Sequence, residues 1–151
     1  MANVVTPDDY EAIRQLTARY CQAADTKNSN AWVDCFTADA VCEFGGLGSA
    51  DGHKELRGFF AKVCDLWSFM WHTAANHRIE VRDDGTAQGV CYFDFRSAFG
   101  RQTWLGGGEY IDEYRKIQGA WKISRRNVRF DFLTPLEIGW GAEPRVRMPG
   151  Q

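Results

Sequence analysis

Residues 101–133, RQTWLGGGEYIDEYRKIQGAWKISRRNVRFDFL, give the clearest indication of the fold of this chain. It contains two long runs that alternate like strands, Arg101–Ile117 and Ala120–Leu133, and the Gln118-Gly119 pair between them predicts a tight hairpin turn. The glycines Gly106–Gly108 would let the first strand bend sharply or approach its neighbour closely. We therefore expect a long, curved hairpin of antiparallel strands.

The residues before this hairpin predict two more strands, preceded by helices. Met70–Arg82 and Thr86–Ala98 are extended runs joined by a turn at Asp83–Gly85. A capping Thr before Pro7, followed by apolar residues at the helical period, predicts a first helix that ends at about Ala24–Lys27. The other expected elements are a short helix through Trp32 and Cys35 capped within Asn28–Asn30, a turn at Phe36–Ala40, a strand at Val41–Phe44, a flexible loop at Gly45–Gly52 and a helix at about His53–Leu66.

Helices come first and an antiparallel meander comes last, which is an α+β arrangement. Three N-terminal helices packed on one curved, mostly antiparallel sheet would form a cone around an apolar pocket. The length of 151 residues suits a single domain, 1–151, with its core at about residues 8–133. The C-terminal tail, 134–151, and the loop Gly45–Gly52 are both placed to act as lids.

Composition and charge narrow the function classes. The chain is 44% hydrophobic and 25% charged, as in ordinary globular proteins, and its formal charge of −2 lacks the basic surplus expected of a nucleic-acid-binding protein. No apolar run approaches the roughly 20 residues of a membrane span, and Met1–Asp9 is unlike a signal peptide. We therefore expect a cytoplasmic protein that binds neither nucleic acid nor membrane.

The cysteines and histidines argue against a metal or disulfide framework. Five cysteines are an odd number, and none of them form a C-x-x-C pair, so we expect reduced thiols in the core. His72 and His77 lie five residues apart with no H-E-x-x-H helix, so we expect no metal site. The sequence also lacks a phosphate-binding G-x-x-x-x-G-K-[ST] loop, and we expect no cofactor.

His72 is a candidate general base. It follows the aromatic-rich segment Trp67–Trp71, and apolar surroundings lower the pKa of a histidine and favour its neutral form. The alternation of this strand does not decide which face is buried, and a bulge would put His72 and Ile79 on the same side. The alternative is a packed histidine bonded to the backbone.

Asp25 and Tyr20 lie toward the end of the first predicted helix. A carboxylate at a helix C-terminus meets the negative end of the helix dipole, so a compensating partner for Asp25 is plausible. Tyr20 falls on the apolar face of that helix. The alternatives are a solvated aspartate at the helix end and a core tyrosine whose hydroxyl is already bonded.

Both faces of the last strand change character midway. A cone interior that is apolar at its closed end and polar at its mouth would give this pattern, and so would a strand that leaves the core. Arg129 then becomes a candidate contact for an anion or a leaving group, the alternative being an arginine on a solvent-facing surface. The candidate substrate-binding residues are Trp71, Asn76, Asn127 and Asp131.

Several segments together resemble the SnoaL-like branch of the nuclear-transport-factor-2-like superfamily. They are Tyr20–Asp25, Trp32–Ala40, His72-x-x-x-Asn76, Gly107–Tyr114 and Gly119–Ser124. Their order and spacing carry the resemblance over about residues 8–133, and it implies the cone-shaped α+β fold.

Within that superfamily the chain is most similar to the hexachlorocyclohexane dehydrochlorinases, with the scytalone dehydratases further off. The shared features include Tyr110-x-Asp-Glu-Tyr and Phe132-x-Thr-Pro. The resemblance implies a His–Asp dyad, His72 and Asp25, assisted by Arg129. Tyr20 occupies the position of the family's lysine, and a phenol suits hydrogen bonding to a hydroxyl or carbonyl oxygen, as in the dehydratases.

These observations predict a cofactor-free lyase that eliminates water, hydrogen halide or formaldehyde from an apolar, aromatic or cyclic small molecule. Its catalytic residues would be His72, Asp25, Tyr20 and Arg129. An isomerase or polyketide-type cyclase in the same pocket is one alternative, and a non-catalytic small subunit of a ring-hydroxylating dioxygenase is another. We also expect a homo-oligomer, a dimer or trimer.

Overall fold

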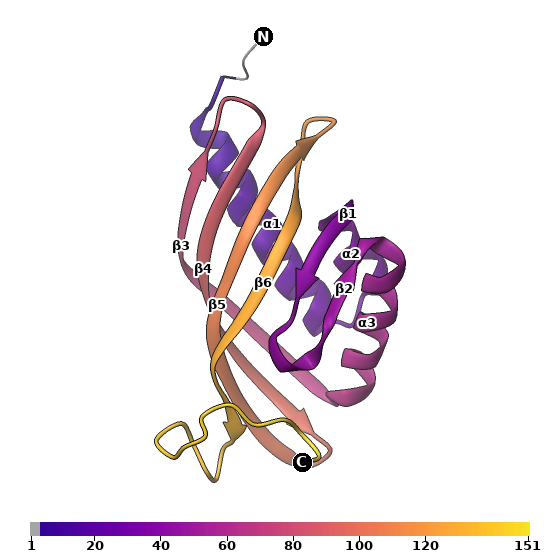
Figure 1. Cartoon of the computed structure of the whole chain (residues 1–151), viewed down its shortest axis with the longest axis vertical. Coiled ribbons are helices and arrows are strands. Elements are labelled where there is room, and N and C mark those ends of the chain that lie inside the picture. Colours follow the sequence, from indigo (N-terminus) through magenta and orange to yellow (C-terminus); the bar gives the residue numbers. More distant parts are fainter. Residues whose placement is uncertain (1–3) are drawn as a thin grey trace.

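A computed structural model describes residues 4–151 and contains one six-stranded sheet in the order β2-β1-β6-β5-β4-β3. All neighbouring strands are antiparallel except β1 and β6, which are parallel. Long hairpins join β3 to β6 into a strongly curved meander (Figure 1). The strands are β1 (Phe36–Glu43), β2 (Ser49–Asp51), β3 (Phe69–Val81), β4 (Thr86–Phe99), β5 (Gln102–Ile117) and β6 (Ala120–Pro135).

Three helices cover the concave side of this sheet. The long helix α1 (Pro7–Asp25) crosses behind the strands, whereas α2 (Ser29–Asp34) and α3 (Gly52–Leu66) lie beside β1 and β2 (Figure 1). Asn28 caps α2, since its side-chain oxygen accepts a hydrogen bond from the Ala31 backbone N–H at 3.1 Å. The predicted α+β class, with three helices on a curved, mostly antiparallel sheet, is confirmed.

Two local predictions in the first half were wrong. Phe36–Ala40, expected as a turn, is the first part of β1, because Phe36 pairs with Ile123 of β6. The segment Gly45–Gly52, expected as a flexible loop, contains a 3₁₀ turn (Gly45–Leu47) and strand β2. Pairing with the distant strand β6 overrides local preference in the first case, and a short hairpin with β1 orders the second segment.

A buried contact at Asp9 fixes the start of α1 against the β5–β6 hairpin. One Asp9 carboxylate oxygen accepts hydrogen bonds from Lys116 Nζ at 2.8 Å and Trp121 Nε1 at 2.9 Å. The Thr6 backbone N–H donates to the other oxygen at 2.9 Å. These bonds hold the pKa of Asp9 well below its usual range. They also fix the helix whose far end carries Asp25.

Irregularities in the sheet set which side chains face the helices. The pairing register shifts between Ala75 and Arg78 in β3 and at two places in β6, at Ser124 and at Asp131, each of which is an extra residue relative to β5. A side chain at Gly108 would overlap the carbonyl oxygen of Arg129, so only glycine permits this approach. Each shift interrupts the alternation along its strand and turns the following residues to the other face.

The C-terminal tail returns along the end of β6. Leu133 donates its backbone N–H to Arg145 and accepts one from Arg147, at 2.9 and 2.8 Å. Met148 then packs beside Gly46 of the 3₁₀ turn. The tail and the Gly45–Leu47 turn are therefore in contact, and Figure 1 shows the tail (yellow) at the lower end of the long strands.

Candidate active site

An apolar cavity lies between the helices and the concave face of the sheet. It encloses about 510 Å³ of unfilled space, part of which is open to solvent, and ten of its sixteen lining residues are Phe, Tyr or Trp. The lining comes from α1, α2, α3 and all four long strands. Tyr20, His72 and Tyr110 bring most of the polar atoms into this lining. The cavity therefore offers a few polar groups in mainly aromatic surroundings, as small-molecule sites commonly do.

Asp25 and His72 meet at the wall of this cavity. His72 Nδ1 lies 2.6 Å from Asp25 Oδ1, and the His72 backbone N–H lies 3.1 and 3.0 Å from the two carboxylate oxygens. These contacts supply the partner that a carboxylate at a helix C-terminus needs. Both side chains are mostly buried, with 12% of His72 and 16% of Asp25 exposed. Because Asp25 holds Nδ1, Nε2 is the imidazole nitrogen left to exchange a proton with a molecule in the cavity.

The bulge in β3 determines where its two histidines point. His72 lies before the register shift and His77 after it, yet both side chains are on the partly buried face, together with Ile79. Asn76 takes a positive φ of 52° within the bulge, a conformation that asparagine tolerates better than most residues. A bulge therefore does put His72 and Ile79 on the same side of the strand.

Tyr20 and Arg126 form a buried stack behind the cavity. The Arg126 guanidinium lies 4.2 Å from the Tyr20 ring centre and 4.0 Å from that of Tyr110, in cation–π geometry on both. Burial raises the pKa of Tyr20 to about 12, although the charge of Arg126 opposes the rise. Tyr20 therefore keeps its proton at neutral pH and can donate a hydrogen bond.

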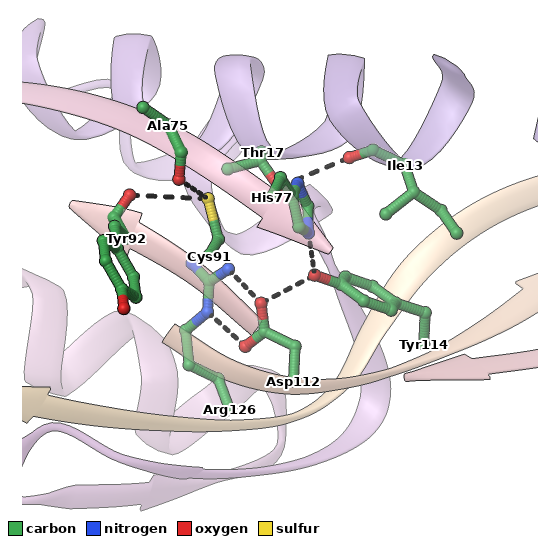
Figure 2. A network of polar contacts seen from close by, with 9 residues as sticks. All are labelled: Ile13, Thr17, Ala75, His77, Cys91, Tyr92, Asp112, Tyr114 and Arg126. Atoms are coloured by element: carbon green, nitrogen blue, oxygen red, sulfur yellow. Dashed lines mark hydrogen bonds and ion pairs between the residues drawn. The ribbon is translucent and has the colours of Figure 1, made fainter. Parts of the chain in front are cut away.

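Arg126 is the inner end of a polar network that crosses the core (Figure 2). Its Nε and one terminal nitrogen donate to the two oxygens of Asp112 at 2.8 and 2.7 Å, and both side chains are fully buried. The Tyr114 hydroxyl also donates to Asp112, at 2.8 Å, and lies 3.1 Å from His77 Nε2. Since the hydroxyl hydrogen goes to Asp112, Nε2 of His77 must carry a hydrogen and donate to Tyr114.

This network predicts that stability depends on the protonation of His77. Burial, reinforced by the charges of Arg126 and Arg14 and opposed by that of Asp112, lowers the pKa of His77 from 6.5 to about 4. The unfolded chain therefore takes up this proton at a higher pH than the folded chain does, so the free energy of unfolding should fall as the pH drops from about 6.5 to 4. His77→Gln should flatten this part of the curve, as measured by urea unfolding at pH 7, 6 and 5. An unchanged pH dependence in the variant would contradict the assignment.

The other residues expected at the site lie outside the cavity. Arg129 is on the outer face of the sheet, where it is 56% exposed and pairs with Glu109 at 2.7 Å. The register shift in β6 explains this position, because it turns Arg126 and Val128 inward and their neighbours outward. The structure thus does not bring Arg129 to His72 and Asp25.

The four expected substrate-binding residues are likewise not part of the cavity lining. Asn76 and Asp131 line an open hollow on the outer face, beside Gly107. Asn127 lines a second surface hollow, and the Trp71 side chain is largely exposed at 53%. The inward-facing set missed from sequence is Arg126, Asp112, Tyr110 and Trp67. The change in character of both faces midway along β6 indicated the bulge, but it did not show at which residue the bulge lies.

The thiols and the carboxylates show no metal-binding arrangement in the part of the chain described. All five cysteines are free, and within residues 4–151 no group of three or more His, Cys, Asp or Glu is placed to hold a metal ion. Burial raises the pKa of Cys21 and of Cys42 to about 12, so these thiols remain protonated at neutral pH. No helix in this range is both long and apolar enough to span a membrane.

Comparison with known proteins gives one family match and several structural relatives. The family model of the SnoaL-like domain matches residues 6–127. An uncharacterized protein of Mycobacterium tuberculosis is 26% identical over 129 residues, which cover 83% of this chain and 88% of that protein.

Solved structures share the whole fold. A type 2 hexachlorocyclohexane dehydrochlorinase superposes with a TM-score of 0.80 at 22% identity, covering 95% of this chain and 96% of that one. A candidate scytalone dehydratase of Novosphingobium aromaticivorans gives 0.79 at 17% identity, with 95% and 94% covered. A candidate aromatic ring hydroxylase of the same species gives 0.81 at 28% identity, with 87% and 96% covered.

Proposed function

Since this chain belongs to the SnoaL-like domain family, we propose that it is a cofactor-free lyase acting on an apolar, cyclic or aromatic small molecule. The reaction is a base-initiated elimination that releases water, hydrogen halide or formaldehyde. The single observation that carries the proposal is the His72–Asp25 pair at the wall of an aromatic cavity, with Nδ1 and Oδ1 2.6 Å apart.

When water or hydrogen halide leaves, His72 Nε2 accepts a proton from the carbon adjacent to the one that bears the leaving group, the C–H electrons form the new double bond, and the bond to the leaving group breaks. When formaldehyde leaves, Nε2 accepts the O–H proton of the hydroxymethyl group, the O–H electrons form the carbonyl bond of formaldehyde, the C–C bond breaks, and the carbon that keeps its electrons takes the proton back from the imidazolium. Asp25 keeps the imidazole in the required tautomer and stabilises the imidazolium that forms. The backbone contact between the two residues keeps their relative position fixed.

Tyr20 supplies the hydrogen-bond donor of the mechanism. Its raised pKa keeps it protonated, so it can donate to an oxygen or halogen that becomes negative as the bond breaks. Arg126 lies behind the Tyr20 ring and does not line the cavity. We therefore assign the role of the positively charged residue to Arg126 and not to Arg129. Arg126 acts through Tyr20 as a positioning residue.

Mass spectrometry on a panel of compounds tests this function. The panel holds apolar cyclic and aromatic compounds with a hydroxyl, hydroxymethyl or halide β to an acidic C–H, incubated with wild type and with His72→Ala. Loss of water, halide or formaldehyde with wild type alone would support the lyase and identify the leaving group. A changed product of equal mass would instead support an isomerase or polyketide-type cyclase, which needs the same base and donor but no leaving group.

A second candidate is the non-catalytic small subunit of a ring-hydroxylating dioxygenase. The 28% identity to a candidate aromatic ring hydroxylase favours this alternative, and it also favours an aromatic ring as the ligand. If the protein converts no compound of the panel and copurifies with a large metal-bearing subunit, the small-subunit function would be supported and the lyase function contradicted.

We extend the proposal to a homo-oligomer, a dimer or trimer, formed through the outer face of the sheet. Trp71, Tyr92 and Ile111 are 53%, 51% and 37% exposed on that face. Large exposed apolar side chains on one surface favour association, because burying them removes apolar area from water. Light scattering should give a mass of at least two chains, and a strict monomer at micromolar concentration would contradict this.

A further inference from the structure

Two buried polar groups lack a hydrogen-bond partner near the start of β3. Within the described part of the chain, neither Trp67 Nε1 nor Ser97 Oγ is bonded to any atom. Trp67 is fully buried and Ser97 is 2% exposed. Native proteins pair nearly all their buried polar groups, so two neighbouring exceptions call for a partner that is not part of the chain.

The two groups lie beside the same pair of aromatic rings. Ser97 on β4 lies directly opposite Trp104 on β5, and two residues along β4 from Phe95 on the same face. The Trp67 ring packs edge-on against both flanking rings, at 5.4 Å from Phe95 and 5.9 Å from Trp104. Trp67 and Ser97 therefore adjoin the same two residues, Phe95 and Trp104.

Trp67 lines the same cavity as His72, and Ser97 lies buried behind this lining. Trp67 and Phe95 both line the cavity, and the His72 ring packs on Phe95 at 4.7 Å. Trp67 and His72 thus flank one phenylalanine ring. A single ring system in the cavity would have one edge near the His72 imidazole and another near the Trp67 ring.

We propose that Trp67, with Ser97 beside it, is a specificity-determining contact that binds an oxygen substituent of the substrate. The indole N–H can only donate, so the substituent must accept: a carbonyl, phenol or ether oxygen on the ring. The Ser97 hydroxyl can donate to the same atom. This inference rests on the proposed function for the position of the reacting carbon beside His72, and it narrows the substrate class to oxygenated cyclic compounds.

Binding of two matched probes tests the contact without requiring turnover. 1-Indanone and indane share one bicyclic carbon skeleton and differ by the carbonyl oxygen. Both are titrated into ¹⁵N-labelled protein, in which the six tryptophans give separate indole N–H signals. The Trp67 signal is identified as the one missing in Trp67→Phe. We expect 1-indanone, but not indane, to move the Trp67 proton downfield.

The affinities provide the second readout. The preference for 1-indanone over indane should be about 3–10-fold greater in wild type than in Trp67→Phe, the range expected for one neutral hydrogen bond. Trp104→Phe is the matched control, because its indole N–H already donates to Gln102 at 3.0 Å and it does not line the cavity. It should keep the wild-type preference. Ser97→Ala removes only one unpaired oxygen and should reduce the preference without affecting folding.

Three results would overturn the proposal. They are an unchanged preference in both Trp67→Phe and Ser97→Ala, an unmoved Trp67 signal at saturation with 1-indanone, and no binding of 1-indanone up to its solubility limit. The second result would indicate a trapped water as the partner. The titrations are repeated in His72→Ala, where the preference should persist. Elimination activity without the preference for 1-indanone would mean that only the Trp67 contact fails. The preference without elimination activity would mean that only the lyase mechanism fails.

Discussion

Replacing His72 by alanine should lower kcat/KM by about 10²–10⁴-fold for any compound that wild type eliminates, because the reaction then lacks its base. Asp25→Asn should cause a loss in the same range. The amide can still contact the backbone N–H of His72, but it cannot stabilise the imidazolium as a carboxylate does. Steady-state kinetics on both variants, with product mass as the assay, measures these losses.

A matched control separates catalysis from folding. His53 is a second histidine, whose Nε2 lies 2.9 Å from the Phe36 carbonyl oxygen and which does not line the cavity. His53→Gln should therefore keep wild-type kcat/KM. Thermal unfolding of all three variants checks that each retains its fold. Near-wild-type activity in either His72→Ala or Asp25→Asn, with the fold intact, would refute the dyad.

Elements with a strong local signal could be predicted from sequence. The capping Thr6 and Pro7 gave the start of α1, and Gln118-Gly119 gave the turn between β5 and β6. The family resemblance, which rests on several loose segments in a fixed order, was confirmed by the family match over residues 6–127. Strand β1 was partly missed because its first residues pair with β6, more than 80 positions later, and no local pattern reports such pairing.

The candidate site was harder to predict because it depends on register. Sequence identified Asp25 and His72, and the structure brings these residues together although they are 47 positions apart. Arg129 was a candidate because both faces of the last strand change character midway and because the family resemblance implied it, and Asn127 was expected to bind substrate. One extra residue in that strand reverses the faces, so Arg126 is buried and Arg129 is not. A shift of one residue has no signature in composition, and it decides which arginine belongs to the interior.

Arg126→Met should be among the most destabilising single changes in this protein. The guanidinium and the Asp112 carboxylate are both fully buried and joined by two hydrogen bonds of 2.8 and 2.7 Å. Removing one partner leaves the other charge buried without compensation, which costs about 3–5 kcal/mol of unfolding free energy. Arg125→Met is the matched control, since Arg125 lies one residue away on the outer face and its pair with Glu113 is largely exposed at 3.8 Å. It should change stability by no more than about 0.5 kcal/mol.

A double-mutant cycle distinguishes a compensated charge from simple loss of packing. Urea unfolding at pH 7 of Arg126→Met, Asp112→Leu and the double variant gives the coupling between the two sites. If buried charge is the cause, the double variant should lose less stability than the two single losses added together, because it leaves neither ion unpaired. Additive losses, or an Arg126→Met variant as stable as Arg125→Met, would show that an unpaired buried charge is not the cause of the destabilisation. The guanidinium also packs on the rings of both Tyr20 and Tyr110, so the same variant that removes the charge removes a support of the cavity wall. The stability of this ion pair and the position of the proposed hydrogen-bond donor therefore depend on the same side chain.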